Sequence, residues 1–184
     1  MVIKLNDLIC TYSNVLDSST CEQLIEVYEN NSKYHEPYEN KQLVNFNQLN
    51  FTNNQNTDNE KLLHEILIGK VLDYKTEYYN FVDNRVFPVD NNFEHFTIKK
   101  YNSGDGYYNT HVDVFDYASS RRYLCFLFYL NDVIDGGNTI FADKSIIPET
   151  GKLLVFPPLW TFPYKEDIPT NTPKYILTTY LHYI

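Results

Sequence analysis

The feature that most constrains the fold is a change of hydrophobic period after residue 92. From there on, short apolar or alternating runs are separated by Gly, Pro and Asp, a pattern typical of closed β architectures. The predicted strands are 93–101, 122–130, 138–142, 151–156 and 174–183. We therefore expect an α+β fold, a double-stranded β-helix (jelly-roll) barrel with two N-terminal helices packed against it.

The first predicted helix follows residues 1–17, which indicate a strand and a turn. The run from Ser19 to Glu22 has the form of a capping box, and the apolar spacing after it predicts a helix of about three turns that ends near Asn30. Residues 31–56 are rich in Asn and Gln and predict a long irregular segment. Such a segment is either a lid or binding loop, or it is disordered.

A second capping box at Thr57 opens the stronger helix, whose apolar residues repeat at helical spacing to about Asn80. A chain of 184 residues accommodates one well-buried core. We therefore treat residues 1–184 as a single domain, in which 1–92 form helical and loop support and 93–184 form the jelly-roll core that carries the site.

The charge and cysteine content exclude several classes of function. The chain has 15 Lys and Arg residues against 24 Asp and Glu residues, which argues against a nucleic-acid binder and against attraction to an anionic membrane. Its three cysteines lack C-x-x-C spacing, so we expect no disulfide framework. No signal peptide or membrane-spanning run is evident. We expect a cytoplasmic protein, and the sequence leaves its oligomeric state open.

His111 and Asp113 form a His-x-Asp pair whose spacing suits two side chains on the same side of a strand end. An imidazole and a carboxylate are two of the three ligands of a 2-His-1-carboxylate Fe(II) site, which leaves three coordination positions open. The pair alone is also compatible with an ordinary polar turn. Lys174, which opens the last predicted strand, is either a second element of the site or a solvated lysine.

The motifs around this pair resemble the Fe(II)- and 2-oxoglutarate-dependent dioxygenases, most closely the prolyl 4-hydroxylase-like group. The resemblance covers about 80 residues in the C-terminal half, and its motifs keep the family's order and spacing. They are Y-x-x-G (Tyr101, Gly104), Y-x-x-H-x-D (Tyr108, His111, Asp113), R-Y (Arg122, Tyr123), YLN (Tyr129 to Asn131), GG-x-T-x-F (Gly136 to Phe141), G-x-L-L-x-F-P (Gly151 to Pro157) and KY (Lys174, Tyr175).

The resemblance implies the following roles. His111 and Asp113 would bind Fe(II), and Lys174 would bind the distal carboxylate of the co-substrate 2-oxoglutarate. Tyr129 would hydrogen-bond the same carboxylate, and Tyr101 would line the pocket near the co-substrate. Both tyrosines are equally compatible with places in the core.

Strand alternation indicates which further side chains face the cavity. If Lys174 points inward, then Ile176, Thr178 and Tyr180 do so as well. We take Thr178 as a further cofactor-binding candidate and Tyr180 as a catalytic candidate. Arg122, at the mouth of its strand, is either a substrate contact or a surface charge.

The second iron-binding histidine of the family falls on Tyr164, ten residues before Lys174. His182 is a poor substitute, because it lies about 26 Å beyond Lys174 along an extended strand at roughly 3.3 Å per residue. Three explanations stay open: Tyr164 binds the metal as a phenolate, water or a carboxylate such as Glu166 or Asp167 takes the third place, or the site is inactive.

The resemblance thus implies an enzyme that hydroxylates a C–H bond of a prolyl, peptidyl or amino-acid substrate and releases succinate and CO2. The alternative is a member of the fold that binds 2-oxoglutarate, a metal or a peptide without oxidising anything. A jelly roll that binds a sugar or nucleotide would leave the spacing of His111, Asp113 and Lys174 unexplained.

Overall fold

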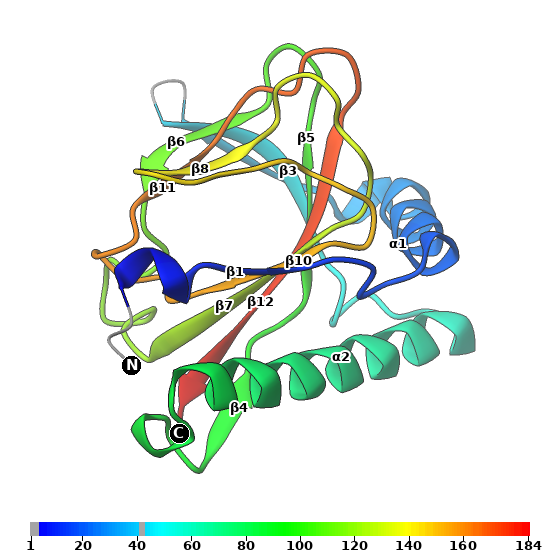
Figure 1. The fold of residues 1–184 in the computed structure, drawn as a ribbon. Coiled ribbons are helices and arrows are strands. Elements are labelled where there is room, and N and C mark those ends of the chain that lie inside the picture. The colour runs from blue at the N-terminus through cyan, green and yellow to red at the C-terminus, as the bar shows by residue number, and fades with distance from the viewer. Residues whose placement is uncertain (1–3, 41–42) are drawn as a thin grey trace.

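The structure, a computed structural model, describes residues 4–40 and 43–184; the parts of the sequence predictions that fall on 1–3 and 41–42 lie outside it. One twelve-stranded antiparallel sheet curls into a barrel, and two α-helices lie on its outer side (Figure 1). The prediction of a jelly-roll barrel with two packed helices is therefore confirmed.

The elements have the following bounds. In chain order they are η1 (Leu5–Leu8), β1 (Cys10–Tyr12), α1 (Ser18–Asn30), η2 (Ser32–Tyr34), β2 (Glu36–Asn40), β3 (Val44–Asn50), α2 (Asp58–Val82), η3 (Asn84–Val86), β4 (Asn91–Phe93), β5 (Thr97–Tyr101), β6 (Tyr107–His111), β7 (Arg122–Tyr129), β8 (Thr139–Phe141), β9 (Ser145–Ile146), β10 (Leu153–Phe156), β11 (Tyr164–Glu166) and β12 (Lys174–Tyr183).

The two helices begin at different kinds of cap. At α2 the predicted capping box is present: the Thr57 hydroxyl accepts from the Glu60 amide, and the Glu60 carboxylate accepts from the Thr57 amide. At α1 the predicted capping box is wrong. Asp17 is the N-cap, and its carboxylate accepts a hydrogen bond of 2.7 Å from the Thr20 amide. An aspartate is as good an N-cap as a serine, so the helix begins two residues earlier than the pattern indicates. Neither helix of the described residues is long and apolar enough to cross a membrane.

The segment expected to be irregular contains a β-hairpin instead, formed by β2 and β3. In β3 the apolar side chains of Val44, Phe46 and Leu49 are buried, while the Asn and Gln residues between them are more exposed. The polar composition hid this alternation from the sequence reasoning. The consequence for the fold is large, since β3 lies between β5 and β6 and joins the two sides of the barrel. Residues 1–92 therefore contribute strands to the barrel as well as the helices that pack against it.

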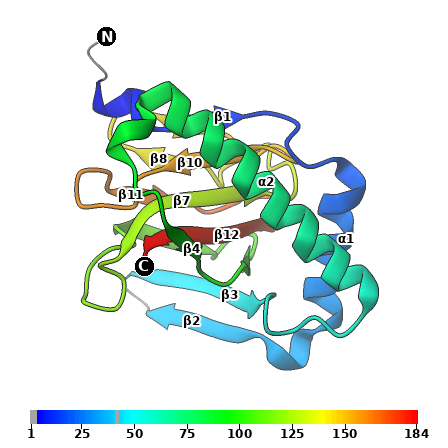
Figure 2. The same cartoon turned by 90° about the horizontal axis from the view of Figure 1, so that it is seen from below.

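The molecule has two hydrophobic cores, one on each face of the sheet. Alternate residues of β7 divide between them: Phe126 and Phe128 pack against the helices, whereas Cys125, Leu127 and Tyr129 fill the barrel. Figure 2 shows α2 lying across the outer face of the sheet. The barrel interior is therefore closed on its helix side by a dry, packed layer.

The strand pairing brings the candidate residues into the barrel. β6 pairs with β11 so that His111 stands opposite Tyr164. β12 lies between β7 and β5, with Lys174 opposite Tyr101. The sequence predicted the positions of β7, β8, β10 and β12 and missed β6, β9 and β11, which are short and largely polar. The single strand predicted over 93–101 is interrupted in the structure, where β4 ends at Phe93 and β5 begins at Thr97.

Candidate functional site

At one end of the barrel interior, His111, Asp113 and Tyr164 form a tight cluster. The His111 Nε2 atom lies 3.6 Å from Asp113 Oδ1, and both side chains are more than nine-tenths buried. The Tyr164 hydroxyl lies 3.1 Å from each of the two carboxylate oxygens of Asp113 and donates to them. The sequence therefore brings the expected imidazole, carboxylate and phenol together.

Burial determines the charges of this cluster. It lowers the pKa of His111, although the nearby Asp113 carboxylate opposes the shift, so the imidazole is neutral at pH 7. Burial, together with the charge of Asp113, raises the pKa of Tyr164 well above its usual value. The phenol is thus protonated and serves as a hydrogen-bond donor to the carboxylate.

One nitrogen of His111 has no partner in the described part of the chain. Its Nδ1 atom lies 2.8 Å from the carbonyl oxygen of Asn109, and its ring stacks on Tyr108 with centroids 3.4 Å apart. These contacts fix the ring so that Nε2 points toward Asp113, buried but without a hydrogen bond. A buried polar atom without a partner is costly unless a ligand or water completes it.

The third corner of this cluster is occupied by Tyr164 alone. Asp167 pairs with Lys165 at 3.7 Å and is exposed, while Glu166 turns to Lys174. Among residues 4–40 and 43–184, no three His, Cys, Asp or Glu side chains gather closely enough to hold a metal ion. Neither Glu166 nor Asp167 therefore stands beside His111 and Asp113 in this structure.

Lys174 lies deeper in the barrel and is already paired. Its fully buried ammonium lies 2.5 Å from Glu166 Oε2 and donates a second hydrogen bond of 2.6 Å to the Gly137 carbonyl. The Gly136-Gly137 turn presents this carbonyl; both glycines have positive φ, and a Cβ on Gly136 would lie 2.1 Å from the Ile168 carbonyl oxygen. Burial lowers the pKa of Lys174, and the Glu166 carboxylate opposes that shift.

Tyr101 and Tyr129 surround this ion pair. The Lys174 ammonium lies 4.7 Å from the centroid of the Tyr101 ring. The Tyr129 hydroxyl donates to Thr139 at 2.7 Å, and Thr139 donates to Glu166 Oε2 at 2.9 Å. Both tyrosines therefore lie around the Lys174–Glu166 pair, and the carboxylate at the end of this network belongs to the chain itself.

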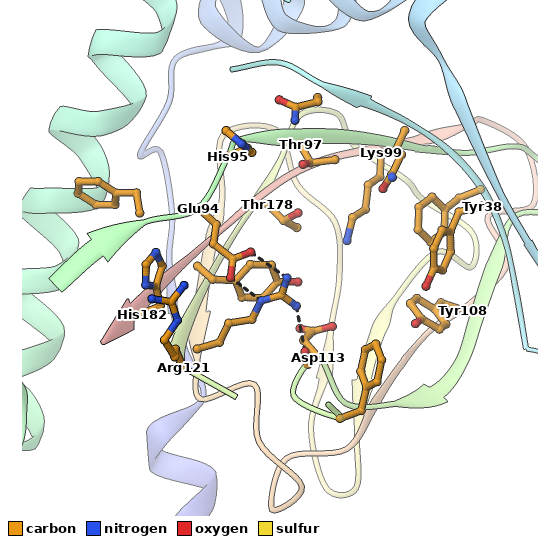
Figure 3. A pocket seen from close by; sticks show the side chains of 17 residues that line it. Tyr38, Glu94, His95, Thr97, Lys99, Tyr108, Asp113, Arg121, Thr178 and His182 are labelled. Carbon is orange, nitrogen blue, oxygen red and sulfur yellow. Dashed lines mark hydrogen bonds and ion pairs between the residues drawn. The ribbon is translucent and has the colours of Figure 1, made fainter. Parts of the chain in front are cut away.

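A pocket of about 580 Å³ opens from the Asp113 end of the barrel to solvent. Figure 3 shows its walls, with the Lys99 side chain extending from β5 into the space. The residues around it are Tyr38, Phe46, Gln48, Asn50, Phe93, Glu94, His95, Thr97, Lys99, Tyr108, Asp113, Phe115, Arg121, Arg122, Thr178, Tyr180 and His182. We call this space the mouth pocket.

The remaining candidate residues line the mouth pocket. Arg122 binds Glu94 through two hydrogen bonds of 2.7 and 2.8 Å, donates to the Asp113 carbonyl, and stacks over the Tyr180 ring. Although burial lowers the pKa of Arg122, its hydrogen bonds with Glu94 raise it above the ordinary value. Thr178 also faces the pocket, as strand alternation from Lys174 requires.

Sequence reasoning missed two charged groups of this site. The sequence prediction gives Glu166 a role only as a metal ligand, although its position two residues after Tyr164 places it on the same inner face. The prediction does not include Lys99, although it stands two residues after Thr97, which also faces the pocket. The Lys99 ammonium lies 5.4 Å from the centroid of the Phe46 ring, and it forms no ion pair with the described residues. Alternation along β5 and β11 was the signal for both residues.

Residues 96–182 match the model of the 2OG-Fe(II) oxygenase superfamily. This part of the chain, which carries every residue of the two clusters described above, is therefore similar to that superfamily. No match is found among curated proteins.

Three solved prolyl hydroxylases share the fold. The collagen prolyl hydroxylase vCPH of Paramecium bursaria Chlorella virus-1, in a 2OG complex, is 18% identical with a TM-score of 0.69, and the match covers 96% of this chain and 97% of that one. A Trichoplax adhaerens prolyl hydroxylase, in complex with a hypoxia inducible factor peptide fragment, is 17% identical with a TM-score of 0.76, and 97% and 85% are covered. The Pseudomonas putida prolyl-4-hydroxylase is 18% identical with a TM-score of 0.72, and 96% and 93% are covered. The chain thus has the prolyl hydroxylase fold.

The superfamily implies Fe(II) and 2-oxoglutarate, and the residues present fit this pair poorly. His111 Nε2 is buried beside Asp113 and has no hydrogen-bond partner within the described ranges, which suits a cation. The third corner holds a protonated phenol in place of an imidazole, and the ammonium that would anchor 2-oxoglutarate is bound to Glu166. A hydroxyl of the chain therefore already binds the carboxylate that Fe(II) would need, and a glutamate of the chain already binds the ammonium that 2-oxoglutarate would need.

Proposed function

We propose that the chain is a non-oxidising member of the superfamily that binds a peptide in the mouth pocket. The observation that carries this proposal is the pair of hydrogen bonds from the Tyr164 hydroxyl to Asp113. A protonated phenol is a far weaker ligand for Fe(II) than an imidazole is. Its proton is also hydrogen-bonded to the carboxylate that would bind the metal. Only His111 and Asp113 then remain as strong ligands for the metal.

The mouth pocket supports a peptide as the ligand. It combines aromatic walls (Tyr38, Phe46, Tyr108) with the cation of Lys99, which has no ion-pair partner in the part of the chain that the structure describes, and the chain has a net charge of −9. Aromatic surface with a few fixed polar groups is the usual composition of a peptide or ligand site. The Trichoplax adhaerens neighbour, whose fold this chain shares, is in complex with a peptide.

The metal part of the proposal is tested by anaerobic Fe(II) titration of the wild type and of two variants at one position. Tyr164→His supplies the missing imidazole, and we expect it to tighten Fe(II) binding at least about tenfold, or 1.4 kcal/mol. Tyr164→Phe removes the hydroxyl without adding a ligand and serves as the matched control. If Tyr164→His binds Fe(II) no better than Tyr164→Phe, then Tyr164 does not stand at the metal position and the argument fails.

The ligand part is tested with a library of short peptides selected on the wild-type protein. We expect the selected peptides to lose binding to Lys99→Glu and to Tyr180→Ala, which change the pocket. They should bind normally to Leu62→Ala, which changes an exposed residue on α2. Peptides that bind all three variants equally would show that the mouth pocket is not the binding site.

A second candidate is a 2-oxoglutarate- and O2-dependent hydroxylase of the prolyl 4-hydroxylase type. The observation that favours it is the buried Nε2 atom of His111, which has no partner in the described chain and points to Asp113. In this case Arg122 and Tyr180 would contact a prolyl, peptidyl or amino-acid substrate. Release of succinate from 2-oxoglutarate by the wild type with Fe(II) would establish this candidate and refute the first.

A further inference from the structure

The deep end of the barrel contains a complete recognition site for a carboxylate. Its parts are the Lys174 ammonium, the Thr139 hydroxyl and, one hydrogen bond further away, the Tyr129 hydroxyl. The Tyr101 ring covers the ammonium. A fixed cation with hydroxyl donors in a buried setting is what binding the far carboxylate of a diacid requires.

That recognition site is filled by the chain itself. Glu166 Oε2 accepts hydrogen bonds from both Lys174 and Thr139, and the glutamate side chain is almost completely buried. Glu166 reaches this place because it follows Tyr164 by two residues on β11, so both side chains point into the barrel. The second oxygen of Glu166, Oε1, is buried and has no hydrogen-bond partner among residues 4–40 and 43–184.

The surroundings of the ion pair disfavour a second carboxylate. The mouth pocket reaches Asp113, Thr178 and Tyr180, but its walls do not include Lys174, Tyr101 or Tyr129. A second pocket, of about 220 Å³, has Glu166 in its wall but not Lys174, and Tyr101 and Tyr129 belong to a buried apolar cluster. A bound diacid would place further negative charge beside Glu166 and Asp113 at low dielectric, where like charges repel strongly.

We propose that the Glu166 side chain permanently occupies this recognition site for a carboxylate, and that it thereby excludes 2-oxoglutarate and other five-carbon diacids from the barrel. The inference deepens the proposed function and rests on it, because it states which ligand the non-oxidising barrel has lost. Glu166 is thereby a specificity-determining residue, and the mouth pocket is the ligand site that remains.

The test measures diacid binding without any metal, with 2-oxoglutarate and glutarate as the probes. Glu166→Ala frees both the ammonium and the space, and we expect it to bind the two diacids roughly 10- to 100-fold more tightly than the wild type does, the value of one charge-assisted hydrogen bond. Glu166→Ala/Lys174→Met has the same space without the cation and should bind neither. Glu166→Gln removes the charge without opening space and should also bind neither.

The wild type decides the question even if Glu166→Ala fails to fold. Saturable binding of metal-free 2-oxoglutarate to the wild type, competed by glutarate, would overturn the inference, as would a folded Glu166→Ala that binds no better than the wild type. Failure of the proposed function gives a different result, namely succinate release with Fe(II). A wild type that binds 2-oxoglutarate without turnover would refute the role of Glu166 and leave the non-oxidising function standing.

Discussion

At the scale of single residues, the site is built from polar groups that satisfy one another. The Tyr164 hydroxyl donates to Asp113, and the Lys174 ammonium donates to Glu166. All four side chains are buried. A buried ion pair contributes little net stability when intact, but removal of one partner leaves an uncompensated charge. The Lys174–Glu166 pair should therefore be far more sensitive to single than to double substitution.

This sensitivity gives a prediction for unfolding at pH 7. Lys174→Met leaves the Glu166 carboxylate buried without a cation, and we expect a loss of about 3–5 kcal/mol in the free energy of unfolding. The double variant Lys174→Met/Glu166→Leu replaces both charges with apolar groups of similar size and should lie within about 1 kcal/mol of the wild type or above it. Urea denaturation of the three proteins measures both values. Equal losses in the single and double variants would mean that the pair is not coupled.

The sequence predicted part of this arrangement. Motif spacing indicated that His111, Asp113 and Lys174 would meet in one barrel, and the ten-residue interval back from Lys174 selected Tyr164. The spacing could not indicate which cation Glu166 would meet, because the alternation that turns it inward allows either the metal corner or Lys174. That choice depends on side-chain packing between strands far apart in the sequence.

At the scale of elements, long periodic helices and apolar strands were predictable, whereas short polar strands were not. β7 and β12 stand out in the sequence because each runs through the middle of the sheet with apolar residues on both faces. β3 and β6 contain many Asn, Thr and Tyr residues, and only their pairing with neighbours makes them strands. The hairpin of β2 and β3 was missed for this reason.

The N-cap of α1 is testable at this scale. Asp17→Ala removes the carboxylate that accepts from the Thr20 amide, and we expect a loss of about 0.5–2 kcal/mol in the free energy of unfolding. Ser19→Ala changes the residue that the sequence pattern wrongly suggested, and its effect should stay within about 0.5 kcal/mol. Thermal or urea unfolding of the two variants decides between the caps, and a larger loss for Ser19→Ala would contradict the assignment.

At the scale of the whole molecule, the barrel depends on residues from both halves of the sequence. β1 pairs with β10, and β3 pairs with β5 and β6. The outer face of the sheet is covered by α1 and α2, whose buried residues pack against Phe126 and Phe128. The C-terminal half carries the motifs, but it does not contain a complete sheet.

We therefore predict that residues 93–184 alone do not fold. Without β3, the edges of β5 and β6 lack their partners, and without the helices the apolar face of β7 is exposed to water. The isolated fragment should show poor dispersion of its amide NMR signals and no cooperative thermal transition. The chain of 184 residues should show well-dispersed signals and a cooperative transition. A well-dispersed spectrum for the fragment would mean that the barrel needs no N-terminal strand.

The central position of β12 has a consequence for synthesis on the ribosome. This strand contributes Lys174 and Tyr180 and is inserted between β7 and β5, both of which are translated many residues earlier. Until it emerges from the exit tunnel, these two strands have open edges, and Glu166 has no ammonium to face. Nascent chains that stall before residue 174 should consequently depend on chaperones to keep those edges from aggregating.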